Sequence, residues 1–330
     1  MEEIGILVIN PGSTSTKIGV FVNLNPIFLK NIQHNPAELA EFEKISDQFD
    51  YRKEIIATQL NNANIPKDSI KAVVGRGGLL KPIESGVYLV NERMKEDLRN
   101  GSVGEHASNL GGLIADAFAQ QLQGVKAYIA DPVVVDELDD IARISGNPKL
   151  NRISIFHALN QKTVARSHAK SVMRKYEDMN LIVAHLGGGI TVGAHKMGRV
   201  IDVNNGLDGD GPFSPERSGT LPVGDLVRLC FSGKYTQKEV VRMVKGEGGL
   251  VGYLGTNNAY EVELRMNDGD EEARKIYEAM AYQVAKEIGA ISTVLKGQID
   301  GILITGGIAN SKWFVNQIIE RVHWLSLIHI

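Results

Sequence analysis

Residues Ile6–Val22 read Ile-Leu-Val-Ile-Asn-Pro-Gly-Ser-Thr-Ser-Thr-Lys-Ile-Gly-Val-Phe-Val, and this stretch decides how the fold begins. Two apolar runs rich in isoleucine and valine flank a polar segment with Pro-Gly, a pattern that predicts a buried β-hairpin. The polar segment offers backbone N–H groups, the hydroxyls of Ser13 and Ser15, and the ammonium group of Lys17. Many donors and a positive charge with little side-chain bulk are typical of a phosphate-binding loop. An ordinary polar turn is the alternative interpretation, and the spacing of a Walker A loop is absent.

The composition narrows the class of protein. The chain has 330 residues, which predicts two domains, and its apolar content of 43% is sufficient for sizeable cores. A net charge of −3 does not point to nucleic acid or to an acidic membrane surface as a partner. The single cysteine, Cys230, excludes a disulfide within the chain and suits a reducing compartment. No apolar run reaches the ~18 residues of a membrane span, and the acidic N-terminus is unlike a signal peptide, so we expect a cytoplasmic protein.

Alternating strands and helices predict an α/β fold. The polar stretch 31–64 reads as mostly helical, and a strong amphipathic helix over 105–122 precedes a strand at 127–130. In the second half, strands are expected at 181–186 and 301–305. Polar residues follow several of these strands at their C-terminal ends, which is where open α/β sheets bind ligands.

The two halves of the chain follow one plan, because each opens with a hairpin that carries a serine- or glycine-rich loop. We therefore predict two similar domains, residues 1–150 and 151–330, that face one cleft. Gly146-Asn147-Pro148 supplies the break between them.

Two further loops carry glycines directly after predicted strands. A glycine lets the backbone approach a phosphate closely, since no side chain blocks the contact. The loop that ends at Asn310 also leads into a helix, whose N-terminus favours anions. A tight turn is the other explanation for each of these glycines, which are Gly187, Gly188, Gly189, Gly306 and Gly307.

Five motifs, in order, resemble those of the acetate and butyrate kinase family, a branch of the sugar kinase, Hsp70 and actin superfamily. They are Asn10–Lys17, Ile129–Asp131, Phe156-His157, Ala184–Gly189 and Thr305–Asn310. The resemblance implies two ribonuclease H-like domains of the actin-like ATPase type, flanking a central cleft. Within the family, segments 131–136 and 211–219 are more similar to butyrate kinases than to acetate kinases.

The resemblance implies reversible transfer of the γ-phosphoryl group of ATP to a carboxylate such as butyrate or isobutyrate, with Mg²⁺ as the metal ion. A carboxylate is already a nucleophile, so the enzyme must relieve repulsion between two anions and stabilise charge on the transferred group. Arg76, in Gly75-Arg-Gly-Gly78, can hold a carboxylate with two hydrogen bonds, and the resemblance gives it that role. A solvated turn arginine is the alternative interpretation.

The resemblance also implies roles for other polar residues. Asp131 would lie near the transferred phosphoryl group and Mg²⁺, His157 would steady that group, and His185 would lie near the nucleotide phosphates. A turn cap is the alternative for Asp131, and a hydrogen-bonded core position is the alternative for either histidine. Neither histidine has the spacing of a zinc ligand set. Arg217 is the nearest match to the family's second substrate-facing arginine. The implied nucleotide-binding residues are Asn10, Ser13, Ser15, Lys17, His185, Gly187, Gly188, Gly189, Gly306, Gly307 and Asn310.

Two segments depart from the family pattern. Asn258 and Tyr260 stand where family members usually carry an aspartate and an arginine beside the nucleotide. The segment His323–Ile330 is short and apolar, and we expect a truncated or frame-shifted tail that lacks the final strand of a sheet.

Two other functions are compatible with this sequence. One is a sugar or polyol kinase of the same superfamily, which would need a carboxylate base for its hydroxyl acceptor. The other is a non-enzymatic actin-like protein that assembles with nucleotide and has no use for Arg76. Homo-oligomer formation is implied by the resemblance alone.

Overall fold

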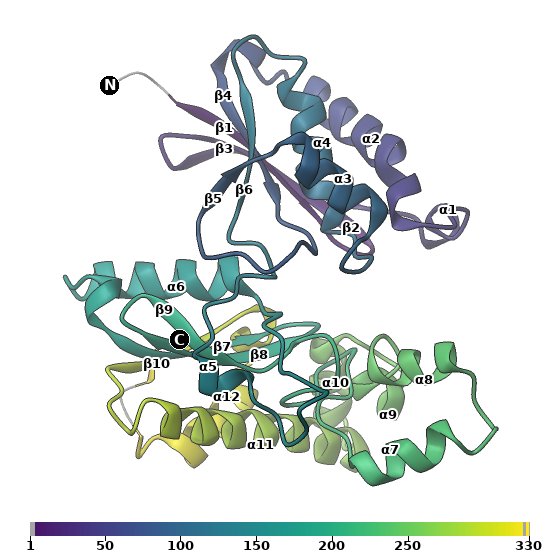
Figure 1. Ribbon diagram of the computed structural model, residues 1–330, viewed down its shortest axis with the longest axis vertical. Coiled ribbons are helices and arrows are strands. Elements are labelled where there is room, and N and C mark those ends of the chain that lie inside the picture. The colour runs from purple at the N-terminus through teal and green to yellow at the C-terminus, as the bar shows by residue number, and fades with distance from the viewer. Residues whose placement is uncertain (1–3, 326–327, 330) are drawn as a thin grey trace. The chain divides into compact units, whose positions relative to one another are not determined.

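The computed structural model describes residues 4–325 and 328–329, and the chain forms two compact units (Figure 1). The first unit extends to Val135 and the second begins at Asp136. The assignment of residues 1–150 to the acyl substrate and 151–330 to the nucleotide stays a prediction. None of the helices within the described ranges combines the length and apolar character of a membrane span.

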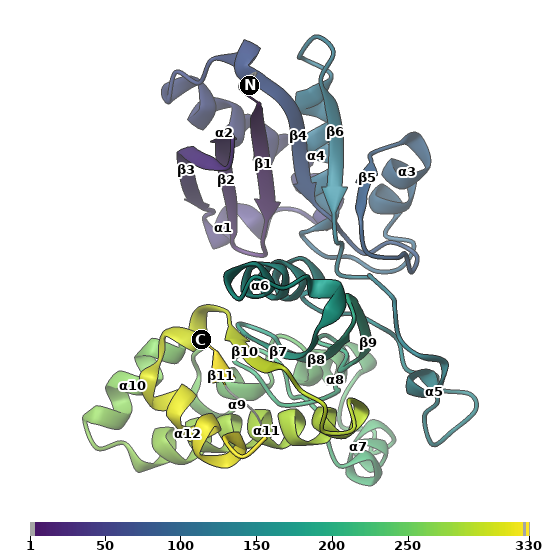
Figure 2. The same cartoon turned by 90° about the vertical axis from the view of Figure 1, so that its left-hand side faces the viewer.

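The first unit is an α/β unit with one sheet. Its elements are β1 (Gly5–Pro11), β2 (Ser15–Val22), β3 (Asn25–Gln33), α1 (Pro36–Leu39), α2 (Phe49–Asn62), β4 (Ile70–Arg76), β5 (Val87–Leu89), α3 (Glu92–Asn100), α4 (Asn109–Ala119) and β6 (Lys126–Ala130). The strand order is β3-β2-β1-β4-β6-β5, with β1, β2 and β3 antiparallel and β1, β4 and β6 parallel. Helix α4 packs on β1, β4 and β6, and α2 packs on α4 (Figure 2).

A close contact between β4 and α4 fixes the end of β4. A Cβ atom added at Gly75 would overlap the carbonyl group of Gly111, and one at Gly78 would overlap Asn109. The side chain of Asn109 also binds the loop, because its Oδ1 accepts a hydrogen bond from the N–H of Leu79 (2.8 Å). Glycines are therefore required on both sides of Arg76, and α4 holds this residue at the edge of the sheet.

The second unit contains the longer helices. Its elements are α5 (Asp140–Arg143), α6 (Ala158–Ser171), β7 (Asn180–Leu186), β8 (Ile190–Lys196), β9 (Arg199–Val203), α7 (Val223–Cys230), α8 (Gln237–Val244), α9 (Gly249–Leu254), α10 (Ala259–Asn267), α11 (Glu271–Val294), β10 (Gly301–Thr305), α12 (Lys312–Val322) and β11 (Ile328–His329). The strand order is β11-β10-β7-β8-β9.

Both faces of this second sheet are buried. Ile182, Ala184 and Leu186 of β7 join the core formed with α11 and α12, whereas Leu181 and Val183 join the core beneath α6. Alternate side chains of one strand therefore serve two cores, which explains why β7 is a continuous apolar run rather than a polar–apolar alternation.

The two sheets share one topology, and this confirms the predicted pair of similar α/β domains. The order β3-β2-β1-β4-β6 corresponds to β9-β8-β7-β10-β11, with an antiparallel meander followed by parallel strands in both. Strand β5 extends only the first sheet. The prediction that the final strand is missing is wrong, because Ile328–His329 pairs in parallel with β10 as a two-residue strand.

Candidate active site

The first unit brings Asn10, Arg76 and Asp131 to one edge of its sheet. The register pairs Ile9 with Gly75, and Arg76 with Ala130, so these three polar residues stand at the C-terminal ends of adjacent parallel strands. Lys17 pairs directly with Asn10 across the hairpin and is exposed. Asn10 and Lys17 lie on the same face of the sheet, because directly paired residues point to one side. Arg76 reaches the same place, since its Nη1 lies 3.4 Å from Asn10 Oδ1.

Arg76 is a half-buried cation without an anionic partner in the part of the chain that the structure describes. Its Nη1 donates a long hydrogen bond to Asn10 Oδ1 (3.4 Å), and it forms no ion pair with any carboxylate of the described residues. Burial lowers the pKa of its guanidinium group because the charged form loses hydration. A guanidinium group in this setting fits a site that receives an anion.

Asp131 has a strained backbone and a fixed carboxylate. Its φ angle is +36°, and its side chain is buried, with 6% of the residue exposed. Oδ1 accepts hydrogen bonds from Ser85 Oγ (2.6 Å) and from the N–H of Gly86 (2.9 Å). Among the described residues, no group of three or more histidine, cysteine or acidic side chains is placed to hold a metal ion together. A single oriented carboxylate still suits Mg²⁺, which is commonly held by one or two carboxylates together with water and substrate phosphates.

The predicted phosphate loop joins β1 and β2 as a tight hairpin. The N–H of Gly12 donates to the carbonyl of Ser15 (2.7 Å), and Ser13 is exposed while Ser15 is half-buried. Arg52 lies beneath this loop and was not predicted from the sequence. It is fully buried and donates hydrogen bonds to the loop's carbonyl groups. No sequence signal distinguishes it from the other charged residues of the polar helix α2.

Two histidines stack in the second unit. The rings of His157 and His185 have centroids 3.9 Å apart and planes 18° apart. Nδ1 of His185 donates to Asn160 Oδ1 (2.7 Å), and Nδ1 of His157 forms a hydrogen bond with Thr191 Oγ1 (2.9 Å). These bonds fix the orientation of both rings, and a Cβ atom at Gly187 would lie 2.9 Å from His185 Nε2. The second nitrogen of His185 thus lies beside the glycine loop.

A buried polar network supports the histidine pair. Gln161 Nε2 donates to Thr191 Oγ1 (2.8 Å), and Gln161 Oε1 accepts from His195 Nε2 (3.0 Å). Tyr176 then donates its hydroxyl proton to His195 Nδ1 (2.7 Å). Burial, with Lys162 and Arg166 nearby, lowers the pKa of His195 to about 3, so this imidazole is neutral.

The structure brings Arg217 to the glycine loop. Its Nη1 donates to the carbonyl of Gly206, and a Cβ atom at Gly189 would overlap its guanidinium group. Ser214 Oγ donates to the carbonyl of Gly188 (2.7 Å), which ties the segment around Arg217 to the loop a second time. Arg217, predicted from one sequence motif, therefore contacts the glycine loop 187–189, which was predicted from another.

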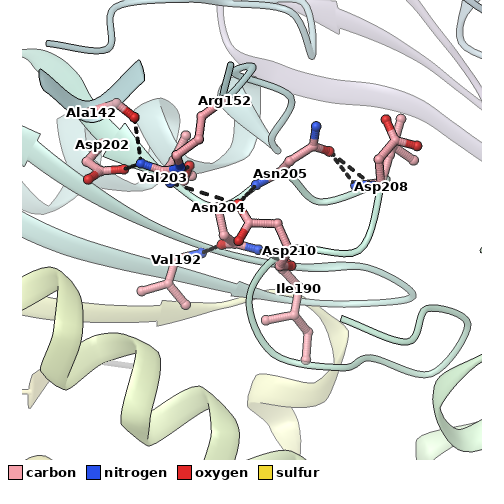
Figure 3. A network of polar contacts seen from close by, with 11 residues as sticks. Ala142, Arg152, Ile190, Val192, Asp202, Val203, Asn204, Asn205, Asp208 and Asp210 are labelled. Carbon is pink, nitrogen blue, oxygen red and sulfur yellow. Dashed lines mark hydrogen bonds and ion pairs between the residues drawn. The ribbon is translucent and has the colours of Figure 1, made fainter. Parts of the chain in front are cut away.

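Polar contacts hold the chain between β9 and Arg217 (Figure 3). Arg152 forms an ion pair with Asp202 (2.8 Å) and donates to the carbonyl of Val203 (3.1 Å). Asn204 Nδ2 donates to the carbonyl of Asp210 (3.2 Å), and its Oδ1 accepts from the N–H of a residue in β8 (2.7 Å). These contacts anchor both ends of the loop whose Gly206 carbonyl receives Arg217.

A cavity of about 530 Å³ adjoins the glycine loops of the second unit. Its walls include Gly187, Gly188, Gly307, Asn310 and Ser311, together with Asn258, Tyr260, Glu263 and Tyr277. Gly306 has a φ angle of +95°, and a Cβ atom there would overlap the backbone of Leu186, so only glycine fits this turn. The hydroxyl of Tyr277 is buried, and Ser311 and Glu263 lie near it.

The two residues that depart from the family pattern also line this cavity. Asn258 caps α10, since its Oδ1 accepts from the N–H of Tyr260 (3.1 Å) and of Glu261 (3.4 Å). Tyr260 is 67% exposed. Neither Asn258 nor Tyr260 carries a charge, so these two residues offer polar contacts but no ion pair to a ligand.

Comparisons with known proteins agree with this architecture. The crystal structure of acetate kinase from Porphyromonas gingivalis matches with a TM-score of 0.77 and 18% identity, covering 97% of this chain and 88% of that chain. A propionate kinase from Francisella tularensis subsp. tularensis SCHU S4 matches with a TM-score of 0.72 and 22% identity, covering 98% and 89%. Acetate kinase from Entamoeba histolytica matches with a TM-score of 0.74 and 18% identity, covering 97% and 87%.

These identities show a shared fold. A family model described as the acetokinase family matches residues 149–329, which is more than half of the chain. This protein therefore belongs to the acetokinase family.

Proposed function

We propose that this protein transfers the γ-phosphoryl group of ATP to a short-chain carboxylate, with butyrate or isobutyrate as the preferred acceptor, and that the transfer is reversible. Membership of the acetokinase family supports a carboxylate kinase. The observation that carries the proposal for this chain is Arg76, a half-buried cation at the C-terminal edge of a parallel sheet without a carboxylate partner among the described residues. A substrate carboxylate would supply the missing anion.

Arg76 and Asn10 would position the acceptor. Two parallel hydrogen bonds from the guanidinium group would hold one carboxylate and offset its repulsion from ATP. A carboxylate oxygen then forms a bond to the γ-phosphorus atom while the bond from that atom to the bridging oxygen of ADP breaks. No proton has to be removed from the acceptor, so the site needs no general base.

The glycine loops would hold the nucleotide. The cavity beside them, about 530 Å³, is of a size that suits a small ligand or cofactor. Asn310 would offer hydrogen bonds to it, and His185 would lie near its phosphates. His157 and Arg217 would stabilise the charge on the transferred group, as preorganised donors do in phosphoryl transfer.

The hairpin of the first unit would bind the phosphate chain through Ser13, Ser15 and Lys17. Asp131 would hold Mg²⁺, because its Oδ1 is already oriented by Ser85 and Gly86. Mg²⁺ held by Asp131 would supply positive charge that neutralises part of the charge of the phosphate chain.

The choice of butyrate rests on two segments, 131–136 and 211–219, that are more similar to butyrate kinases. The matched crystal structures carry the names of acetate and propionate kinases, so acetate and propionate are the competing acceptors. One methylene in an apolar pocket contributes about 1–3 kcal/mol of discrimination, which is enough for an assay to resolve.

A single assay tests the proposal. ATP-dependent acyl phosphate is trapped as the hydroxamate with acetate, propionate, butyrate or isobutyrate, and glycerol phosphorylation is followed in parallel. We expect the highest kcat/KM with butyrate or isobutyrate. A preference for acetate or propionate would overturn the acyl assignment alone. Glycerol phosphorylation would indicate a polyol kinase, and ATP hydrolysis without any acceptor would indicate an actin-like assembly protein.

Two further features stay predictions: a cytoplasmic location and a homo-oligomer. Light scattering coupled to size-exclusion chromatography measures the mass of the particle, and a monomer at micromolar concentration would contradict the second of them.

A further inference from the structure

Arg52 of α2 lies directly beneath the phosphate hairpin. It is fully buried, with 0% exposure, and forms no ion pair with a carboxylate of the described residues. Its Nη1 donates to the carbonyl of Gly12 (2.8 Å), the carbonyl of Ser15 (3.4 Å) and Thr16 Oγ1 (3.1 Å). Its Nη2 donates to the carbonyl of Ser13 (3.1 Å). Most of the N–H groups of Arg52 therefore donate to the loop that joins β1 and β2.

The remaining donors fix the arginine on its own helix. Nε and Nη2 both donate to Gln48 Oε1, at 3.1 Å and 2.8 Å. On the same buried side, His34 Nε2 forms a hydrogen bond with Thr16 Oγ1 (2.7 Å). Burial and the nearby Arg52 lower the pKa of His34 to about 4, although Glu38 acts in the opposite direction, so His34 is neutral and Arg52 is charged.

The orientation of the carbonyl groups determines where the loop's N–H groups point. In a trans peptide, the C=O of one residue and the N–H of the next point in opposite directions. Because the carbonyls of Gly12 and Ser13 point at Arg52, the N–H groups of Ser13 and Thr14 point away from it. Neither N–H has an acceptor among the described residues.

The loop consequently presents two unpaired N–H groups on the side away from the protein core. Successive N–H groups of this kind form a concave binding site for an anion. The buried guanidinium group adds a positive charge behind them, compensated only by carbonyl and hydroxyl dipoles. A purely structural arginine would normally be neutralised by a buried carboxylate.

We propose that Arg52 is a positioning residue for phosphate binding, which turns the N–H groups of Ser13 and Thr14 toward the ligand and reinforces them with its charge. This inference rests on the proposed function, since the ligand it serves is the phosphate chain of ATP. Arg52 itself does not touch the ligand.

The test compares Arg52→Met with Arg52→Lys and Gln48→Leu. Arg52→Met should raise the KM for ATP at least tenfold and leave the KM for butyrate within twofold. Arg52→Lys keeps the positive charge but loses the planar guanidinium group. Gln48→Leu keeps the arginine but removes the hydrogen bonds that hold it on its own helix. Both variants should therefore raise the KM for ATP by less than Arg52→Met does. A merely structural role would lower the amount of active enzyme, and hence the apparent kcat, without moving one KM selectively.

Lys95→Met is the matched control. Lys95 is also a buried cation of the first unit, 5% exposed, but it pairs with Asp116 (2.7 Å) away from the hairpin. Thermal unfolding of each variant shows that the protein is folded at the assay temperature. An unchanged KM for ATP in Arg52→Met, or an equal increase in Lys95→Met, would overturn the role of Arg52.

A second measurement does not depend on turnover. The amide NMR signals of Ser13 and Thr14 are followed in the full chain while ATP, and separately inorganic phosphate, is added. We expect saturable shifts in the wild type that are lost or weakened in Arg52→Met or Arg52→Lys. Shifts of equal size in wild type and both variants would overturn the inference. Failure of the proposed function would instead appear as a wild-type enzyme that forms no acyl phosphate.

Discussion

At the scale of single residues, Arg76 shows how a site can be incomplete without its ligand. Its guanidinium group loses hydration on burial, and a 3.4 Å hydrogen bond to Asn10 is its one polar contact to the described residues. A buried cation with so little compensation costs free energy in the free protein. A bound anion would compensate the buried charge and remove this unfavourable free energy, which would increase the affinity for the substrate.

Arg76→Ala should therefore lower kcat/KM for butyrate by at least about 100-fold, because each hydrogen bond to a charged group contributes about 1.5–3 kcal/mol. Arg76→Lys should have a kcat/KM for butyrate between those of the wild type and Arg76→Ala, since it keeps the positive charge without the planar guanidinium group. Acyl hydroxamate formation at varied butyrate concentration measures the effect. Arg99→Ala changes an exposed arginine at the end of α3 in the same unit, and an equal loss in this control would contradict the role of Arg76.

His195 makes a different prediction, which concerns stability against pH. Its pKa is about 3 in the folded protein and 6.5 in the unfolded chain, so the unfolded state binds a proton first as the pH falls. The contribution of neutral His195 is complete above pH 6.5 and is lost progressively as the pH falls toward 3. The slope is at most about 1.4 kcal/mol per pH unit for one histidine.

Urea unfolding at pH 7, 6 and 5 measures this slope. His195→Gln should give a flatter dependence of the unfolding free energy on pH than the wild type, whatever its absolute stability. His323→Gln removes an exposed histidine and is the control. Parallel curves for wild type and His195→Gln would show that His195 does not titrate in this way.

At the scale of elements, the hairpin loop 187–189 has room for Arg217 only because residue 189 is a glycine. A Cβ atom at Gly189 would overlap the guanidinium group of Arg217, which is the end of a flexible side chain. Gly189→Ala should therefore move Arg217 rather than unfold the loop. We expect kcat to fall by roughly 100-fold, the effect of losing one preorganised donor, with little change in the unfolding free energy.

Gly146→Ala is the control for Gly189→Ala, because no heavy atom lies within 4 Å of a Cβ atom added there. Acyl hydroxamate formation gives kcat for both variants, and urea unfolding gives their stability. A normal kcat in Gly189→Ala would show that the position of Arg217 is unimportant for catalysis.

Elements with a strong local pattern were predictable from the sequence, and elements set by distant contacts were not. The hairpin of β1 and β2 follows from its two apolar runs, and α11 from its long helical period. The stretch 31–64, read as mostly helical, in fact begins with the end of β3, whose exposed edge position leaves little apolar alternation. The rest of the stretch is mostly helical as predicted, with the short α1 and a 3-10 turn over Ile45–Gln48 before the longer α2 begins at Phe49.

The same distinction holds for the candidate site. Sequence motifs predicted Asn10, Arg76 and Asp131 as site residues, and the strand register places all three at one edge of the first sheet. Arg52 could not be named, because its function depends on contacts with residues about forty positions earlier in the chain. Nothing in a polar helix tells a buried arginine from a solvated one.

At the scale of the whole molecule, one topology occurs twice, and each unit has a core of its own. The second unit buries both faces of its sheet beneath α6, α11 and α12. A unit with its own core can unfold as a separate cooperative step, and a ligand stabilises the unit that binds it. The proposed nucleotide cavity lies within the second unit.

Both tryptophans of the chain, Trp313 and Trp324, also belong to the second unit, so tryptophan fluorescence reports its unfolding alone. ATP at 100 times its Kd should stabilise this unit by about 2.7 kcal/mol and raise the fluorescence midpoint by about 5–10 °C. Butyrate alone should leave the midpoint unchanged, because Arg76 belongs to the first unit. Gly306→Val, which overlaps the backbone of Leu186 beside the cavity, should abolish the shift caused by ATP. A midpoint that ATP does not move, at concentrations that saturate turnover, would place the nucleotide outside this cavity.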